Sequence, residues 1–319
     1  MADLRGGIDL GGTKIQTAIV DGRGDVLGQA RRPTPTSGGP EGVATEMAEA
    51  LREAAKEAGV ESGDLAGVGV GSPGDADEKT GVVSSAKNLP GWDGRFPLAE
   101  KLKETLGTEV RIGNDVQVAT EAEFHLGAGQ EFQSLIGVFW GTGVGGGLVL
   151  DGEPWLGRGA AGEIGHMVIK RGGAKCPCGR RGCLEAYAGR SAMEAEARRR
   201  QEEGHETDLF HLMEKHDKPR LTSGIWERAL DHGDRLAEKL IERAVEALGT
   251  GIASAVNLID PEAVILGGGL GVRFGERLMD PLREEISKHL FVNERPPAVR
   301  IVSLGDLGGA IGASLLISR

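Results

Sequence analysis

All three cysteines of this 319-residue chain lie in one short segment, CPCGRRGCLE, at residues 176–185. Three thiols cannot all pair as disulfides, whereas zinc is bound by thiolates and imidazoles that lie close together in a sequence. Cys176, Cys178 and Cys183 supply three such ligands, and Gly179 and Gly182 favour a loop that wraps an ion. The spacing therefore favours a structural zinc site. The alternative is three reduced thiols that share a loop by chance.

A fourth zinc ligand is expected close to this loop. His166 lies ten residues before Cys176, in GEIGHMVIK, and the next candidate, His205, lies beyond a predicted helix. Glu163 and Glu185 flank the same loop, and ionised carboxylates accept hydrogen bonds strongly from sugar hydroxyls. A metal that holds the loop would also fix the position of Glu185 and His166.

Two glycine-rich turns have the composition of phosphate-binding turns. Gly11-Gly12-Thr13-Lys14 and Gly141-Thr142-Gly143 each stand between two runs of strand-forming residues. Glycine lets backbone N–H groups approach phosphate oxygens, and Thr and Lys add donors and a positive charge. The alternative is that these glycines only form hairpin turns. A third segment, GGGLG at 267–271, follows a predicted strand, and a nucleotide lying between two duplicated halves would use all three.

Asn114 and Asp115 follow a short predicted strand and open a predicted helix that ends near Gly127. Either residue type is a good helix N-cap, which is the simpler interpretation of the pair. One of the two can cap the helix while the other faces a cleft, so a catalytic carboxylate stays possible at this position.

The pattern around the turns predicts an α/β fold with two related halves. Residues 5–20 and 134–152 both predict strand, turn, strand, and a further strand is expected near residues 26–30. A P-loop or a dinucleotide-binding motif would instead continue into a helix after its glycines. Helical spacing is found at 41–59, and a final strand and a glycine-rich helix are expected at 298–318.

Length and charge limit the function. The length suits two domains, and the net charge of −11 argues against a nucleic-acid partner. It also means that an anionic ligand must be received by local groups. No apolar run approaches the roughly 20 residues that span a bilayer, and no secretory signal is visible at the N-terminus. We therefore expect no membrane association and, with free cysteines, a cytoplasmic protein.

Taken together, these motifs resemble the ROK family of sugar kinases and repressors over essentially the whole chain. The matching segments are DLGGTK (9–14), GSPG (71–74), NLPGW (88–92), GND (113–115), GTGVGGG (141–147), EIGH (163–166) and CPCGRRGCLE (176–185). The last two, at this spacing, are the most specific. The resemblance implies a two-domain, actin-like ATPase fold of duplicated ribonuclease H-like type, with a nucleotide and sugar cleft between the domains.

The resemblance also implies domain boundaries and residue roles. Residues 1–112, joined by the C-terminal helix at about 306–319, would form a small domain, and residues 113–305 a large domain with the zinc loop. Asp115 would be the general base. The other implied contacts are these: the sugar with Asn88, Asn114, Asp115, Glu163, His166 and Glu185; the ATP phosphates with Gly11, Gly12, Thr13, Lys14, Gly141, Thr142 and Gly143, with Asp9 near magnesium; adenosine with Gly267, Gly268 and Gly269; zinc with His166, Cys176, Cys178 and Cys183.

The resemblance implies an ATP- and Mg²⁺-dependent hexose kinase with one structural Zn²⁺, glucose as the preferred sugar, and a homodimer or a tetramer. N-acetylmannosamine, fructose, mannose or allose as acceptor and polyphosphate as donor remain alternatives. The family often has Ala-Asn after the aspartate, where this chain has Val116-Gln117, which weakens the transfer of substrate by analogy. A repressor is disfavoured because no helix-turn-helix precedes the first strand, and Asp9, Lys14 and Asp115 argue against a sensor without catalysis.

Overall fold

The computed structural model describes residues 3–86, 89, 91–92 and 94–318. Contacts within the chain separate two compact units. Unit 1 comprises Met1–Glu131, Gly147–Ala161 and Ser303–Arg319, and unit 2 comprises Phe132–Gly146 and Gly162–Val302. The domain boundaries expected from the sequence stay a prediction. Among the described residues, no helix has both the length and the apolar character that crossing a bilayer requires.

The first sheet contains five strands in the order β3-β2-β1-β4-β8. The strands are β1 (Arg5–Leu10), β2 (Lys14–Val20), β3 (Val26–Pro33), β4 (Gly67–Ser72) and β8 (Val110–Asn114). Strands β1, β2 and β3 form an antiparallel meander, and β4 and β8 continue the sheet parallel to β1. The turn after β1 leads into β2, as the alternation of IQTAIVD predicts, and the strand expected near residues 26–30 is confirmed as β3.

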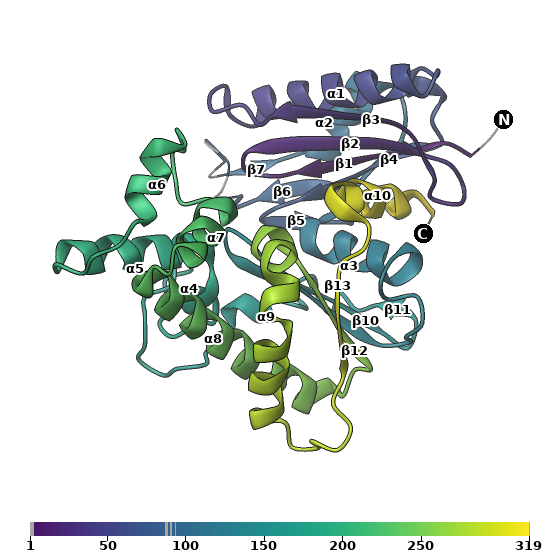
Figure 1. Cartoon of the computed structure of the whole chain (residues 1–319). Helices are drawn as coiled ribbons and strands as arrows, with labels where there is room; N and C mark the ends of the chain where they lie inside the picture. Colours follow the sequence, from purple (N-terminus) through teal and green to yellow (C-terminus); the bar gives the residue numbers. More distant parts are fainter. Residues whose placement is uncertain (1–2, 87–88, 90, 93, 319) are drawn as a thin grey trace. The chain divides into compact units, whose positions relative to one another are not determined.

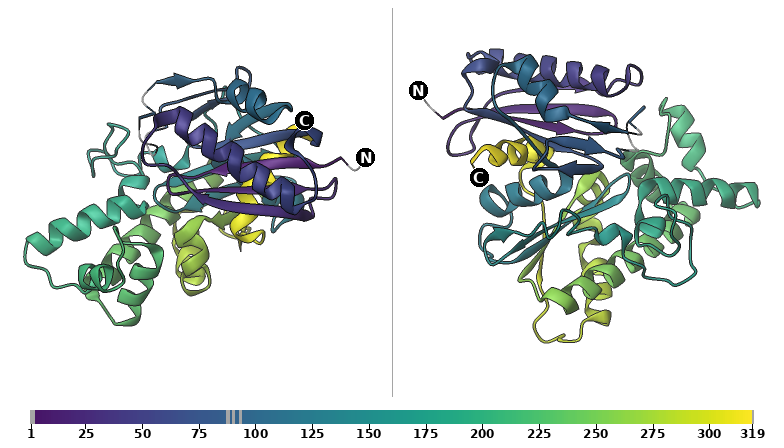
Figure 2. Two further views of the ribbon diagram at one scale, coloured as in Figure 1. Left: turned by 90° about the horizontal axis from the view of Figure 1, so that it is seen from above. Right: turned by 180° about the vertical axis from the view of Figure 1, so that it is seen from behind.

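Helices cover both faces of this sheet (Figures 1 and 2). Helix α1 (Gly39–Glu57) packs on β1, β2 and β3, and α2 (Leu98–Leu106) contacts α1 and β8. On the other face, α10 (Gly308–Leu315) packs on β1, β2 and β4 and on α3 (Asp115–Leu126).

The glycine-rich character of α10 and of the strands beneath it has a packing reason. A Cβ atom on Gly7 of β1 would lie 1.8 Å from the carbonyl oxygen of Ala310, and one on Gly69 of β4 would lie 1.7 Å from that of Ala313. Because only glycine leaves this space, α10 lies with its backbone directly on the sheet.

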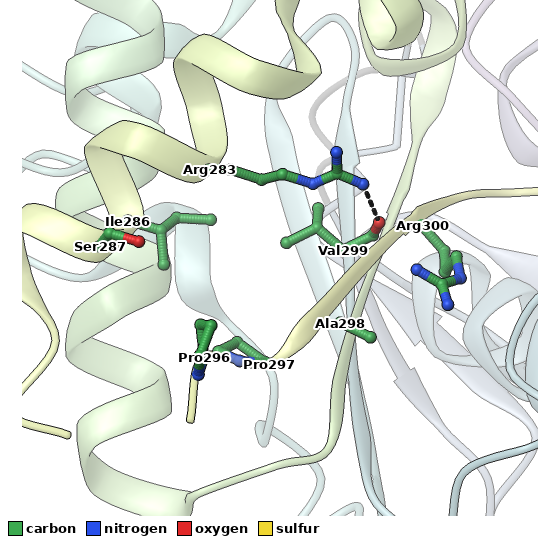
Figure 3. Close-up of a pocket in the computed structure, with 8 residues that line it drawn as sticks. All are labelled: Arg283, Ile286, Ser287, Pro296, Pro297, Ala298, Val299 and Arg300. Atoms are coloured by element: carbon green, nitrogen blue, oxygen red, sulfur yellow. Dashed lines mark hydrogen bonds between the residues drawn. The ribbon is translucent and has the colours of Figure 1, made fainter. Parts of the chain in front are cut away.

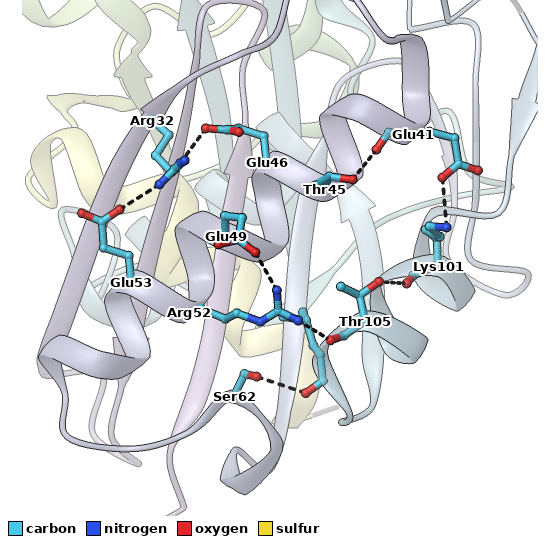
Figure 4. A network of polar contacts seen from close by, with 11 residues as sticks. Arg32, Glu41, Thr45, Glu46, Glu49, Arg52, Glu53, Ser62, Lys101 and Thr105 are labelled. Carbon is cyan, nitrogen blue, oxygen red and sulfur yellow. Dashed lines mark hydrogen bonds and ion pairs between the residues drawn. The ribbon is translucent and has the colours of Figure 1, made fainter.

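A polar network joins α1 to its neighbours in unit 1 (Figure 4). Arg32 of β3 forms ion pairs with Glu46 and Glu53 of α1, at 2.5 and 3.4 Å. The ion pairs of Arg32 fix the end of β3, the segment that leads to Thr34. On the other side of α1, Arg52 donates to the carbonyl oxygen of Thr105 in α2 at 2.6 Å, which ties the two helices together.

The second sheet repeats the strand order of the first, β11-β10-β9-β12-β13. Its strands are β9 (Leu135–Trp140), β10 (Val144–Leu150), β11 (Glu153–Pro154), β12 (Ala263–Gly267) and β13 (Ala298–Ile301). Strands β12 and β13 lie parallel to β9, as β4 and β8 lie parallel to β1. The repeated order confirms the predicted α/β fold with a duplicated, ribonuclease H-like core.

In unit 2, helix α9 packs on β9, β12 and β13, and α8 packs on α9. The helices of unit 2 are α4 (Glu185–Ala188), α5 (Arg190–Glu202), α6 (Leu209–Lys215), α7 (Ser223–Asp231), α8 (Arg235–Ile259) and α9 (Gly268–His289). The sequence predicts a glycine turn after β12, whereas Gly267 ends the strand and α9 begins at once with Gly268.

Unit 1 also contains a small sheet of β5 (Asp75–Asp77), β6 (Val82–Ser84) and β7 (Arg95–Phe96). Among the described residues, short 3₁₀ turns are found at Ser62–Asp64, Ile164–His166, Gly305–Leu307 and Leu316–Ser318.

Candidate active site and metal centre

The carboxyl ends of three parallel strands place the predicted acidic residues of unit 1 at one edge of the first sheet. In the register of the sheet, Asp9 of β1 lies opposite Gly71 of β4, and Gly71 lies opposite Gly113 of β8. Asn114 and Asp115 follow directly. In open α/β sheets this edge is where ligands bind.

The structure shows which of Asn114 and Asp115 caps the helix α3. The Oδ1 atom of Asn114 accepts hydrogen bonds from the amides of Val116 and Gln117, at 3.0 and 3.1 Å, so Asn114 is the N-cap of α3. Asp115 is the first residue of the helix, is half-buried, and accepts from the amide of Val116 at 2.9 Å. The two residues thus differ in position: Asn114 is the cap, and the Asp115 carboxylate lies on the first turn of the helix.

Asp9, at the end of β1, has a perturbed carboxyl group. Burial raises the pKa of its carboxyl to about 6, partly offset by the charge of Lys14, while Asp306 raises it further. A Cβ atom on Gly309 at the start of α10 would lie 2.7 Å from Cγ of Asp9, so α10 closes directly over this carboxyl. The Nζ atom of Lys14 lies 3.5 Å from the exposed Asp306 carboxylate.

The turn from Gly11 to Lys14 is held by a residue that the sequence did not single out. The amide of Gly11 donates to the carbonyl oxygen of Lys14 at 2.9 Å, which closes the turn. Thr34, just after β3, donates its hydroxyl to the carbonyl of Gly11 at 2.6 Å and its amide to that of Thr13 at 3.2 Å. Gly12 and Thr13 remain exposed at the tip. Thr34 therefore fixes the shape of a candidate phosphate-binding turn from another strand.

In unit 2 the Gly141-Thr142-Gly143 turn lies against the first residues of α5 and of α9. The amide of Gly141 donates to the carbonyl of Gly143 at 2.9 Å and so closes the turn. A Cβ atom on Gly141 would lie 3.9 Å from the amide nitrogen of Gly269, in the first turn of α9. Because the first N–H groups of a helix have no intrahelical partner, the turn and α9 together offer several donors to an anion.

Glu185 connects this turn to the cysteine loop. Its carboxylate accepts a hydrogen bond from the amide of Val144 at 3.0 Å, and a Cβ atom on Gly143 would lie 2.1 Å from the same carboxylate oxygen. Glu185 begins α4, two residues after Cys183. The segment that carries the cysteines thus leads directly to this carboxylate, and its positioning by a metal stays a prediction.

His166 and the three cysteines form one cluster, with one ligand atom from each residue and all four atoms within 4.8 Å of one another. The Nδ1 atom of His166 lies 3.8 Å from the sulfur of Cys176, and the sulfurs of Cys178 and Cys183 lie 3.7 Å apart. Tetrahedral zinc with Zn–S bonds of about 2.3 Å requires ligand separations of about 3.8 Å.

The donor set therefore fits zinc, and His166 rather than His205 completes it. Cys176 and Cys183 are buried, and a hydrogen bond from Arg180 lowers the pKa of Cys178 to about 6, which favours the thiolate that zinc binds. Four protein ligands would leave no open position for a substrate on the ion, which is the arrangement of a structural zinc site.

The other predicted sugar ligands are placed as follows. Glu163 is exposed, and its carboxylate lies 3.9 Å from Nε2 of His166, the ring nitrogen other than the one that faces Cys176. Asn88 lies outside the described residues. Unit 1 thus brings together Asp9, Gly11–Lys14, Asn114 and Asp115, and unit 2 brings together Gly141–Gly143, the start of α9, Glu185 and the metal cluster.

Comparison with known proteins identifies the family. The sequence pattern that defines the ROK family matches residues 5–319. The chain belongs to the ROK family. It is 35% identical to the glucokinase of Thermotoga maritima, over 98% of this chain and 96% of that one. The glucokinase of Halalkalibacterium halodurans is 34% identical, with 98% of this chain and 94% of that one covered.

A solved structure supports the same assignment. A ROK family glucokinase from Streptomyces griseus in complex with glucose and AMPPNP is 33% identical, with 98% of both chains covered and a TM-score of 0.84. Kinases for other sugars are also similar to this ROK protein. The N-acetyl-D-glucosamine kinase of Erwinia tasmaniensis is 31% identical over 97% of this chain and 98% of that one.

The departure of this ROK chain from its family after Asp115 has a structural explanation. The side chain of Gln117 donates to the carbonyl of Leu148 at 3.1 Å and accepts from the amide of the same residue at 3.0 Å. It also donates to Glu121, one turn further along α3, at 2.9 Å. Gln117 is buried and pairs with β10 as a neighbouring strand would, so it anchors the start of α3.

A surface pocket beside α9 and β13 lies apart from the predicted site residues (Figure 3). Arg283 crosses it and donates to the carbonyl of Val299 at 3.1 Å. Its lining consists of Arg283, Ile286, Ser287, Pro296, Pro297, Ala298, Val299 and Arg300, which include no predicted site residue.

Proposed function

We propose that this ROK protein is an ATP-dependent glucokinase that transfers the γ-phosphoryl group of ATP to the 6-hydroxyl of glucose. The observation that carries the proposal is the division between Asn114 and Asp115. Asn114 caps α3, and Asp115, the first residue of that helix, places a half-buried carboxylate at the ligand-binding edge of a sheet in a duplicated ribonuclease H-like fold. The full-length similarity to two glucokinases supports glucose as the acceptor.

Asp115 is the proposed general base. Its carboxylate takes the proton of the sugar 6-hydroxyl while the hydroxyl oxygen forms a bond to the γ-phosphorus. The bond from that phosphorus to the bridging oxygen breaks, and ADP leaves with the electron pair. Phosphoryl transfer needs little covalent help from a protein, so positioning and charge stabilisation supply most of the acceleration.

The remaining predicted residues divide between the two substrates. Asn88, Asn114, Glu163, His166 and Glu185 bind the sugar hydroxyls, and Asn114 still offers its amide N–H₂ group after its oxygen has capped the helix. The turns Gly11–Lys14 and Gly141–Gly143 bind phosphate oxygens, and Gly267–Gly269 border adenosine. Asp9 lies near the magnesium ion of MgATP, which neutralises charge on the phosphates.

Release of ADP from MgATP tests the proposal across glucose, mannose, fructose, allose, N-acetylglucosamine and N-acetylmannosamine. The expected result is strong turnover with glucose that is lost in Asp115→Asn. Turnover only with an N-acetylated sugar would keep the mechanism and replace the substrate. Turnover with polyphosphate but not ATP would replace the donor.

A kinase for an N-acetylated hexose is the second candidate, because the chain is also 31% identical to an N-acetyl-D-glucosamine kinase. A sugar sensor without catalysis is the candidate from another class. It predicts that sugar binds with no release of ADP in any combination of the panel.

We also propose a homodimer in the cytoplasm. Leu258 and Phe291 are 82% and 90% exposed in unit 2. They lie near one another, because the side chain of Asn257, the neighbour of Leu258 in α8, accepts a hydrogen bond from the amide of Phe291 at 2.8 Å. Exposed apolar side chains that lie together are typical of an interface. The three free thiols suit a reducing compartment. Light scattering after size-exclusion chromatography tests the dimer, with Phe291→Arg expected to give monomers.

A further inference from the structure

Arg190, a residue that no sequence motif singled out, is hydrogen-bonded to the Gly141-Thr142-Gly143 turn. Its guanidinium donates to the hydroxyl oxygen of Thr142 at 2.7 Å. Its backbone amide donates to the carbonyl of Gly141 at 3.1 Å, and the next amide, of Ser191, donates to the carbonyl of Thr142 at 3.0 Å. Three hydrogen bonds thus hold the start of α5 and one guanidinium beside the turn.

Arg190 differs from the other arginines of its helix. Arg198 pairs with Glu194, Arg199 with Glu196 and Glu203, and Arg200 with Glu196, at distances up to 3.0 Å. Across the described residues, Arg190 forms no ion pair with any carboxylate. The guanidinium of Arg190 is thus bonded to a hydroxyl group rather than to a carboxylate.

The surroundings of Arg190 are unfavourable for a positive charge. It is half-buried and is the first residue of α5, where the helix dipole is positive. Burial, followed by the positive charge of Arg220, lowers the pKa of Arg190, and the negative charge of Glu194 offsets part of this. Arg220 likewise forms no ion pair within the described part of the chain. An anion at this place would relieve all of these costs at once.

The neighbouring groups indicate which anion fits. Thr142 accepts the hydrogen bond from Arg190, so its own hydroxyl proton is left to be donated to a ligand. The first amides of α9 lie beside Gly141, as described above. A guanidinium, a hydroxyl and backbone amides beside one turn are the groups that bind the tetrahedral oxygens of a phosphate chain.

We propose that Arg190 is a further nucleotide-binding residue, which contacts an oxygen of the polyphosphate chain of the phosphoryl donor, with Arg220 adding to the local positive field. This inference rests on the proposed kinase function for the identity of the nucleotide. The local arginine pair supplies the attraction that a chain of net charge −11 does not supply as a whole.

Calorimetric binding of three probes, MgATP, inorganic tripolyphosphate and adenosine, tests the role of Arg190. Arg190→Gln is expected to weaken MgATP and tripolyphosphate about 10- to 100-fold, the range for a hydrogen bond to a charged group. Adenosine and glucose should bind as before, and Arg190→Lys should restore part of the loss. Arg198→Gln, on the same helix, is the control and should leave every dissociation constant unchanged.

Thermal unfolding without ligand separates binding from a purely structural role. If Arg190 serves an anion, Arg190→Gln should leave the Tm unchanged or raise it, because an unfavourable charge is removed. A lower Tm with adenosine and glucose weakened alongside the phosphates would make Arg190 a structural residue and overturn the inference. Unchanged tripolyphosphate affinity, or a wild type that binds no tripolyphosphate, would overturn it as well.

These measurements are made at equilibrium, without turnover. A failed sugar panel would therefore overturn the proposed glucokinase and leave the phosphate contact of Arg190 to be decided by binding alone.

Discussion

The carboxylate of Glu185 accepts a hydrogen bond from the amide of Val144 at 3.0 Å, across 41 residues of sequence. Val144 follows the Gly141-Thr142-Gly143 turn, and Glu185 follows Cys183 of the metal cluster by two residues. One carboxylate thus joins the cysteine loop to the candidate phosphate-binding turn. A zinc ion held by the four ligands would therefore contribute to the shape of that turn as well as to its own loop.

Removal of zinc should destabilise the protein and loosen this turn. We expect about one zinc per chain and a lower Tm after chelation, since a ligand at 1,000 times its Kd stabilises the folded state by about 4.1 kcal/mol. Metal analysis and thermal unfolding check this, with Mg²⁺ restored after chelation. His166→Ala should lose the zinc and the control His205→Ala should retain it. A fully stable, metal-free wild type contradicts the structural role.

Glu185→Gln should separate charge from position. The amide oxygen of glutamine can still accept from Val144, so the Tm should change little, while the lost charge should raise the KM for glucose about 10-fold or more. Glu185→Ala should lower the Tm in addition, because the Val144 amide loses its partner. Steady-state kinetics and thermal unfolding on both variants check the pair. An unaltered KM in Glu185→Gln would remove the residue from sugar binding.

Asp115→Asn should bind glucose but turn over about 10²- to 10⁴-fold more slowly, the usual contribution of a general base. Asn114→Ala is the matched comparison. It should lower the free energy of unfolding by about 1 kcal/mol through the lost N-cap. Turnover and urea unfolding are measured on both. Near-normal turnover in Asp115→Asn would exclude it as the base.

The raised pKa of Asp9 predicts that the ionised Asp9 carboxylate destabilises the folded protein, and that this destabilisation depends on pH. Burial raises the pKa from 3.8 to about 6, so between these values the folded protein keeps a proton that the unfolded chain has lost. The free energy of unfolding therefore falls as the pH rises through this window, and the cost is complete above about pH 6. Without nucleotide or Mg²⁺, Asp9→Asn should raise the Tm at pH 7.5 and have little effect at pH 4.

The exposed Asp3 provides the control for this experiment, because Asp3→Asn should not change the Tm at either pH. An equal gain for Asp9→Asn at pH 4 and pH 7.5 would show that ionisation of Asp9 is not the cause.

Gln117→Leu should destabilise the protein by about 1–3 kcal/mol, because it leaves both backbone groups of Leu148 and one oxygen of Glu121 without this partner. Turnover should fall as well if the start of α3 shifts. Urea unfolding and kinetics check this against Gln130→Leu, an exposed glutamine whose replacement should change neither. An unchanged free energy of unfolding would show that the departure from the family at this position is not an anchor.

Much of the architecture follows from local features of the sequence. The glycine-tipped hairpins at residues 5–20 and 134–152 are confirmed because alternation and turn residues act between neighbours. The helix start at Asn114-Asp115 and the clustered metal ligands were predictable for the same reason, since capping groups and ligands within about 20 residues meet with little dependence on the rest of the fold. The choice of His166 over His205 also agrees with the structure.

Tertiary structure alone decided how these local pieces are held. Thr34 reaches the turn at Gly11 across 23 residues, Gln117 reaches Leu148 across 31, and Arg190 reaches Thr142 across 48. Such contacts depend on strand order and helix packing, which bring distant segments together and leave no periodic mark in the sequence. The amino-acid sequence determined which chemical groups this protein carries. The fold decided that Asn114 is the N-cap of α3 and that Asp115 is its first helical residue, because the cap must lie just before the first turn with its side-chain oxygen facing the amides of Val116 and Gln117.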